Sequence, residues 1–160
     1  APYGVTLVPV TSAQDMFEAV SSRAKEQDII IKAAAVADYR PVTVAENKIK
    51  KSPGDMSIAL ERTTDILAWL GEHRREGQVL CGFAMETEHM VEHAKEKLTR
   101  KHVDMIAANN VKVAGAGFGT DTNVVTLITE DGVEELAKMS KEEVASRIVD
   151  ALLRLRGSME

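Results

Sequence analysis

Several features that often reveal a protein's function are scarce or missing in this sequence of 160 residues. Cys81 is the single cysteine, so the chain cannot form an internal disulfide, which fits a reducing compartment. Every apolar run is shorter than the roughly 20 residues of a membrane span, and the first residues lack the basic region of a signal peptide. The net charge of −5 argues against nucleic-acid binding, which requires a basic surplus. We therefore expect a cytoplasmic protein whose partners include neither nucleic acid nor a membrane.

The composition is that of a globular domain, with 44% hydrophobic and 28% charged residues. The length suits one domain with a substantial core. Short apolar runs alternate with longer amphipathic ones, and this order favours an α/β layered sheet. The sequence predicts strands at Val5–Val10, Asp28–Val36, Gln78–Met85 and Asp104–Ala108, and helices at Asp15–Gln27, Asp65–Arg75, Thr87–Lys101 and Glu142–Leu155.

Cap and turn residues refine this pattern. Thr64 is expected to cap the second helix, and Ser140 with Glu143 is typical of a capping box before the last one. An Asp-Gly turn favours a β-hairpin near the C-terminus. The hairpin is predicted to consist of Asn123–Thr129, the turn Glu130-Asp131-Gly132, and Val133–Ala137.

The segment from Ala33 to Lys51 combines small and cationic residues at the end of a predicted buried strand. Open α/β sheets bind ligands at this edge, and alanines such as Ala33 and Ala34 let a flat ligand approach the backbone. Asp38 can accept hydrogen bonds from a base or ribose, or help to hold a metal ion. Lys48 and its neighbours, on a charged loop, can close over a triphosphate and stabilise charge as it develops on phosphorus. Taken alone, the alanines could equally be packing spacers and the lysines a solvated loop.

Residues farther along the chain are individually ambiguous. Phe83 follows Gly82 at the end of a predicted strand, where it could stack on a base or fill the core. Lys97 and Lys101 lie four apart on one helix face, an arrangement that solvation usually explains. Asn109 follows another predicted strand, and its side chain suits a turn better than a ligand.

Two motifs suggest other enzyme classes. His89–His93 matches the H-x-x-E-H motif of inverted zincins, with both imidazoles on one helix face. The surrounding helix is rich in charge and offers no evident third ligand, so a zinc hydrolase is disfavoured. Gly115–Gly119 is similar to a dinucleotide-binding loop, but no amphipathic helix follows it, which disfavours a dehydrogenase.

In their order along the chain, six short motifs resemble the synthetase domain of bacterial phosphopantothenate–cysteine ligases. The similarity extends from Val5 to about Leu155, and the first two motifs are highly specific to this family. The motifs are AAVADYRP (Ala34–Pro41), K-x-K-K (Lys48–Lys51), TDIL (Thr64–Leu67), GFAMET (Gly82–Thr87), AANNV (Ala107–Val111) and FGTDTN (Phe118–Asn123).

The resemblance implies a single domain over residues 1–160, a three-layer α/β/α sandwich with a Rossmann-like, mostly parallel sheet and a C-terminal antiparallel hairpin. It further implies that CTP, with Mg²⁺, activates 4′-phosphopantothenate to an acyl-cytidylate. L-cysteine then displaces CMP to give 4′-phosphopantothenoylcysteine. Family members act as homodimers in which the flap of one subunit can complete the site of its mate. In nature the domain is usually fused to a flavin-dependent phosphopantothenoylcysteine decarboxylase.

The resemblance also assigns roles to residues of this sequence. Lys48 is implied to be the catalytic lysine of the flap, and no residue is assigned to a metal. Lys97 and Lys101 are implied to recognise the cytosine side of the pocket. The complete set of implied nucleotide-binding residues is Ala33, Ala34, Asp38, Lys48, Thr64, Asp65, Ile66, Leu67, Phe83, Lys97 and Lys101.

Some features depart from the family pattern. Met85 and Asn110 replace residues that are often Ala and Asp in family members. The family's first strand–loop–helix unit has no counterpart in residues 1–160. Without that unit we expect CTP binding but poor turnover of the full reaction. The alternatives are a non-catalytic nucleotide-binding fragment of the enzyme and a relative that uses ATP.

Overall fold

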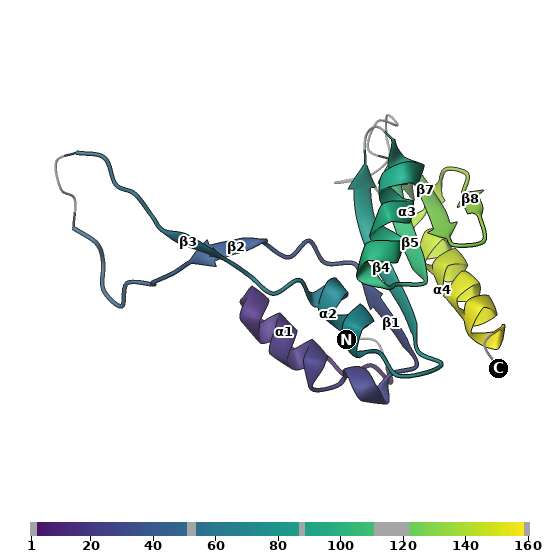
Figure 1. Ribbon diagram of the computed structural model, residues 1–160, viewed down its shortest axis with the longest axis horizontal. Helices are drawn as coiled ribbons and strands as arrows, with labels where there is room; N and C mark the ends of the chain where they lie inside the picture. Colours follow the sequence, from purple (N-terminus) through teal and green to yellow (C-terminus); the bar gives the residue numbers. More distant parts are fainter. Residues whose placement is uncertain (1–2, 51–53, 87–88, 111–121, 159–160) are drawn as a thin grey trace.

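A computed structural model describes residues 3–50, 54–86, 89–110 and 122–158 of the chain. At its centre is a five-stranded sheet with the order β1-β4-β5-β7-β8 (Figure 1). The first three strands in this order are parallel to one another. The fourth is antiparallel to the third, and the fifth is antiparallel to the fourth. The strands are β1 (Ile29–Lys32), β4 (Val79–Glu86), β5 (Met105–Asn110), β7 (Val125–Thr129) and β8 (Val133–Glu135), and a separate short pair consists of β6 (Thr122–Asn123) and β9 (Met139–Ser140).

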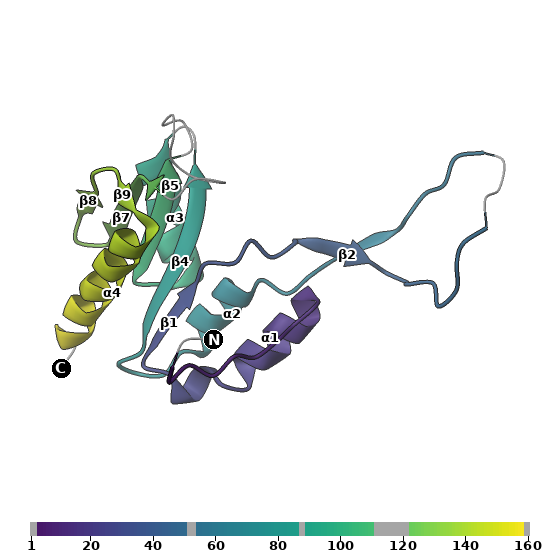
Figure 2. The ribbon, with the colours of Figure 1, turned by 180° about the vertical axis from the view of Figure 1, so that it is seen from behind.

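Helices cover both faces of this sheet. Alternate residues of β4 explain the two layers: Leu80 and Ala84 belong to one core cluster, and Val79 and Cys81 to the other. Figures 1 and 2, which view the molecule from opposite sides, show α3 and α4 on opposite faces of the sheet. The predicted three-layer, Rossmann-like sandwich is confirmed. Its helices are α1 (Ala13–Ser21), the 3₁₀ helix η1 (Ala24–Glu26), α2 (Ile66–His73), α3 (Met90–Lys101) and α4 (Lys141–Gly157).

The helix caps confirm one prediction and correct another. At the start of α4, the Ser140 hydroxyl accepts a hydrogen bond from the Glu143 N–H at 3.2 Å, and the Glu143 carboxylate accepts one from the Ser140 N–H at 2.9 Å. This is the predicted capping box. The cap of α2 is Asp65, whose Oδ1 accepts from the Ala68 N–H at 3.1 Å. The prediction of Thr64 was wrong by one position because aspartate caps a helix at least as well as threonine.

Two predicted elements differ from those observed. The strand predicted at Val5–Val10 is not formed, because an apolar run becomes a strand only beside a partner, and no strand in the described ranges pairs with it. The helix predicted at Asp15–Gln27 is interrupted at Ser22. The Ser22 hydroxyl donates to the Glu18 carbonyl at 2.8 Å, and this bond closes α1.

The remaining boundaries shift by a few residues. β1 ends at Lys32, four residues before the predicted strand end. α3 starts at Met90, and the predicted start at Thr87 lies outside the described residues. The predicted hairpin is confirmed, since the Thr129 N–H donates to the Gly132 carbonyl at 2.9 Å across the turn between β7 and β8.

The segment predicted as a charged loop contains a two-stranded ribbon. β2 (Tyr39–Pro41) pairs antiparallel with β3 (Leu60–Arg62), and an ion pair of 2.7 Å between Arg40 Nε and Glu61 Oε1 links the two strands. Residues 39–62 are called the arm below. Figures 1 and 2 show that the part of the arm beyond β2 and β3 extends far from the sheet.

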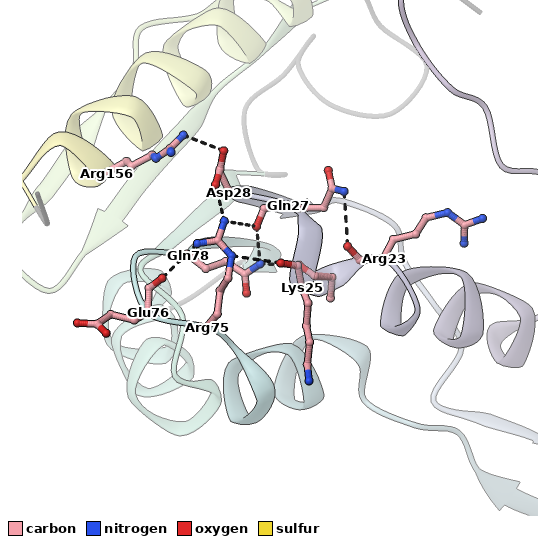
Figure 3. Close-up of polar contacts among 9 residues, drawn as sticks. Arg23, Lys25, Gln27, Asp28, Arg75, Glu76, Gln78 and Arg156 are labelled. Carbon is pink, nitrogen blue, oxygen red and sulfur yellow. Dashed lines mark hydrogen bonds and ion pairs between the residues drawn. The ribbon is translucent and has the colours of Figure 1, made fainter.

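A polar network joins the layers at the amino ends of the strands (Figure 3). Asp28, which directly precedes β1, pairs with Arg75 and, at 3.1 Å, with Arg156 of α4. Gln78, which precedes β4, is only 1% exposed and donates to the carbonyls of Ala24 at 2.7 Å and Gln27 at 2.6 Å. The network holds η1, β1 and β4 together at the edge opposite to the candidate site described below.

Replacement of Gln78 by methionine should reduce the free energy of unfolding by about 1–3 kcal/mol, because one buried and one part-buried hydrogen bond of its amide are lost. Denaturant unfolding measures this loss. The control is Gln27→Met, since Gln27 is exposed and its amide makes only a 3.5 Å contact. Equal stability of the two variants would contradict the assigned role of the Gln78 amide.

Candidate functional site

A pocket of about 500 Å³ opens at the carboxyl ends of β1, β4 and β5, the edge at which open α/β sheets bind ligands. The segment after β1, the start of α2 and one face of α3 complete its walls. Its lining residues are Lys32, Ala33, Ala34, Ala35, Val36, Ala37, Asp38, Thr63, Thr64, Asp65, Ile66, Phe83, Ala84, Met85, Lys97, Lys101 and Asn109.

The small residues after β1 are held in place by Thr63, which directly follows β3. The Thr63 N–H donates to the Asp38 carbonyl at 3.0 Å, and the Thr63 hydroxyl donates to the Ala37 carbonyl at 2.6 Å. These bonds tie together the two segments that flank the arm. They leave the Asp38 side chain exposed at the pocket rim, where it can accept hydrogen bonds from a ligand.

Asp65 and Lys101 form an ion pair in the pocket wall. Lys101 Nζ lies 2.7 Å from Asp65 Oδ2, and the other carboxylate oxygen of Asp65 caps α2. Burial raises the pKa of Asp65. The hydrogen bond and charge of Lys101, the Ala68 N–H and the charge of Lys32 lower it by more, so the net pKa lies below the usual value. The carboxylate of Asp65 is therefore stabilised in its charged form, and the ion pair connects α2 to α3.

Lys32 is a lining residue that sequence reasoning missed. It ends the otherwise apolar strand Ile29–Lys32, and its side chain is half-buried. Burial lowers the pKa of Lys32 and the charge of Lys101 lowers it further, against the opposing effects of Asp65 and Asp38. A lysine at the end of an apolar run was the signal available in the sequence.

Two side chains at the ends of β4 and β5 face the pocket. Phe83 is half-buried and also packs against the core cluster on the α4 side of the sheet. Asn109 belongs to β5 and not to the turn that was predicted, and its amide oxygen accepts from Asn123 Nδ2 at 3.0 Å. A stacking role for Phe83 is compatible with this placement, because the side chain lines the pocket while it packs against the core.

The structure brings most of the predicted site residues together. Leu67 is an exception, because it is buried in the core with its side chain against Gly82. Lys48 is the other, because it lies on the part of the arm that extends away from the sheet. The predicted residues that do line the pocket are Ala33, Ala34, Asp38, Thr64, Asp65, Ile66, Phe83, Lys97 and Lys101.

The other candidate chemistries gain little support. His89 and Glu92 form a 3.1 Å contact, but both are exposed, and the described residues contain no cluster of three or more potential metal ligands. Burial raises the pKa of Cys81 to about 12, which disfavours a thiolate nucleophile there. The loop Gly115–Gly119 lies outside the described residues. None of the helices that the structure describes is long and apolar enough to cross a membrane.

Comparisons with known proteins agree on one family. The DNA/pantothenate metabolism flavoprotein C-terminal domain matches residues 1–155. The coenzyme A biosynthesis bifunctional protein CoaBC of Bacillus subtilis is 50% identical over 149 residues, which are 92% of this chain and 36% of that protein. A cysteine/cysteine sulfinic acid decarboxylase from an unknown prokaryotic organism is 42% identical over 152 residues, 94% of this chain and 42% of that protein.

A solved structure extends this agreement to the fold. The crystal structure of the C-terminal domain of a coenzyme A biosynthesis bifunctional protein CoaBC has a TM-score of 0.79 and 45% identity. The match covers 98% of this chain and 71% of that one. The chain thus spans less than half of the two curated relatives and most of a solved C-terminal domain.

Proposed function

Since this chain belongs to the family of the DNA/pantothenate metabolism flavoprotein C-terminal domain, we propose that it is the CTP-binding part of a phosphopantothenate–cysteine ligase. The observation that carries the proposal is the pocket at the strand ends, which gathers nine of the predicted nucleotide-binding residues. A backbone of small residues and several lysines in one pocket suit a flat base and a phosphate chain, respectively.

The proposed reaction has two steps. A carboxylate oxygen of 4′-phosphopantothenate attacks the α-phosphorus of CTP, and pyrophosphate leaves. The amine of L-cysteine then attacks the acyl carbon of the cytidylate, loses a proton, and displaces CMP to leave an amide. Both steps gather negative charge in their transition states, so fixed cations contribute more than an acid–base pair. Lys97 and Lys101 of α3 are placed to supply them.

The pocket can also accommodate magnesium. Mg²⁺ in nucleotide sites is usually held by one or two carboxylates together with phosphate oxygens. Asp65 has both oxygens engaged, by Lys101 and by the Ala68 N–H, whereas Asp38 is exposed at the pocket rim. We therefore assign Asp38 as the residue that would help to hold the ion, which would neutralise charge on the triphosphate.

A homodimer explains the position of Lys48. The arm carries it away from the pocket of its own chain, so in a dimer the arm can reach the pocket of the partner. The surface of the arm supports such an association, because exposed apolar side chains of this density are typical of interfaces. These side chains are Tyr39, Val42, Val44, Ile49, Met56, Ile58 and Leu60.

A second candidate is decarboxylation of a cysteine-derived acid. It is favoured by the description of the family as a flavoprotein domain and by the relative named as a decarboxylase. The pocket favours the ligase, because its lysines match a triphosphate and its position matches the nucleotide site of open α/β sheets. An ATP-dependent ligase and a nucleotide-binding module without activity are further variants of the first candidate.

One set of assays distinguishes these functions. The chain, and a chain extended to the full C-terminal domain of its relatives, are incubated with CTP or ATP, Mg²⁺, 4′-phosphopantothenate and L-cysteine. The ligase releases pyrophosphate and gives the amide by mass spectrometry. A parallel reaction with FMN and 4′-phosphopantothenoylcysteine tests for carbon dioxide. Carbon dioxide without pyrophosphate would replace the proposal with the decarboxylase, and CTP binding without any product would leave a binding module.

A further inference from the structure

We propose that Lys32 binds a phosphate group of the ligand and is a determinant of affinity in this pocket. The inference rests on the nucleotide site proposed above and adds a residue that neither the sequence motifs nor the resemblance assigned. Lys32 lies at the carboxyl end of β1, opposite Gly82 in the parallel pairing with β4. It lines the pocket together with the small residues that follow it.

The other two lysines of the pocket, Lys97 and Lys101, already interact with protein groups. Lys101 forms its 2.7 Å ion pair with Asp65, and its side chain is only 15% exposed. Lys97 also has a partner. Lys32, in contrast, forms no ion pair with any residue within the described ranges. A ligand anion could therefore pair with Lys32 without breaking an ion pair that the described residues show.

The fixed position of Lys32 favours binding over solvation. Its backbone belongs to the sheet, and Ile30, two residues earlier on the same face of β1, packs against the core beneath α1 and α2. Lysine is seldom buried without a partner, because a desolvated charge is costly. Burial and the charge of Lys101 lower the pKa of Lys32 more than the charges of Asp65 and Asp38 raise it, and a ligand anion would add to the effect of the two carboxylates.

The phosphate can come from two sources, the triphosphate of the nucleotide or the phosphate of 4′-phosphopantothenate. Calorimetric titrations distinguish them with two ligand pairs, CTP against cytidine and 4′-phosphopantothenate against pantothenate. Each is measured on the wild type, on Lys32→Met, which keeps the length of the chain, and on Lys32→Arg, which keeps the charge. Lys25→Met is the control, because Lys25 is exposed on η1 near the opposite edge of the sheet.

We expect Lys32→Met to weaken binding of one phosphate-bearing ligand at least about tenfold, as for a lost charge-assisted contact. Binding of the phosphate-free partner should change less than about twofold, and Lys32→Arg should recover most of the loss. A purely structural role would weaken both members of a pair equally. Unchanged affinity of Lys32→Met for CTP and for 4′-phosphopantothenate would overturn the inference about Lys32. Absence of CTP binding by the wild type would instead overturn the proposed function.

Discussion

Replacement of Gly71 by alanine should reduce the free energy of unfolding by about 3 kcal/mol, the upper end of the range for overpacked sites. A Cβ atom at Gly71 would lie 1.9 Å from the Lys101 carbonyl oxygen and 3.1 Å from that of His102. Both obstacles are backbone atoms, so α2 and α3 must move apart. Alanine stabilises a helix by up to about 1 kcal/mol relative to glycine. The variant is therefore destabilised only if the clash costs more than this gain.

The same displacement should weaken the site. Asp65 at the start of α2 and Lys101 at the end of α3 form an ion pair across this contact, and both line the pocket. Gly157→Ala is the matched control, because Gly157 ends α4 and a Cβ there would contact nothing within 4 Å. Denaturant unfolding and calorimetry with CTP test both effects. If Gly71→Ala were as stable as Gly157→Ala, the tight packing of α2 on α3 would be wrong.

The exchange of Lys48 for glutamine should lower turnover by at least about 100-fold, as expected when a cation that stabilises the transition state is removed. Steady-state release of pyrophosphate by the full reaction measures this effect. Lys50→Gln is the control, since Lys50 is an exposed cation on the same arm. A rate near that of the wild type for Lys48→Gln, or equal losses for both variants, would show that Lys48 has no special role.

A mixing experiment tests whether Lys48 acts on the pocket of the partner. Lys48→Gln retains an intact pocket, and Lys97→Gln retains an intact arm. In randomly mixed dimers about a quarter of all sites would combine an intact pocket with an intact arm, so activity should recover to about a quarter of the wild-type value. No recovery, in dimers shown to exchange subunits, would place Lys48 on the pocket of its own chain.

Local signals and apolar runs predicted much of the fold. The apolar runs of β4 and β5 are buried on both faces, so continuous hydrophobicity was sufficient to identify them. The Ser140–Glu143 capping box depends on neighbours in sequence, and it appeared as predicted. The location of the pocket also followed from the sequence, because parallel strands bring their carboxyl ends to one edge wherever they lie in the chain.

Features that depend on distant partners were not predictable. Residues 5–10 have the composition of a strand, but pairing decides whether a strand forms. Leu67 belongs to the same motif as the pocket residues Thr64, Asp65 and Ile66. Its side chain instead lies in the core, in the space that Gly82 leaves by having no side chain. The role proposed for Lys32 depends on the pairing of Asp65 with Lys101, a contact between α2 and α3. The reach of the arm depends on the pairing of β2 with β3, which are separated in the chain by residues 42–59.

Parallel calorimetric titrations with CTP and ATP test whether the pocket at the ends of β1, β4 and β5 binds CTP. We expect saturable binding of CTP with one site per chain, and a Kd for ATP at least about tenfold higher, a difference of ~1.4 kcal/mol. Asp38→Ala, which alters the rim of the pocket, should weaken CTP binding. If neither nucleotide bound saturably, or if Asp38→Ala left CTP binding unchanged, this pocket would not be a CTP site.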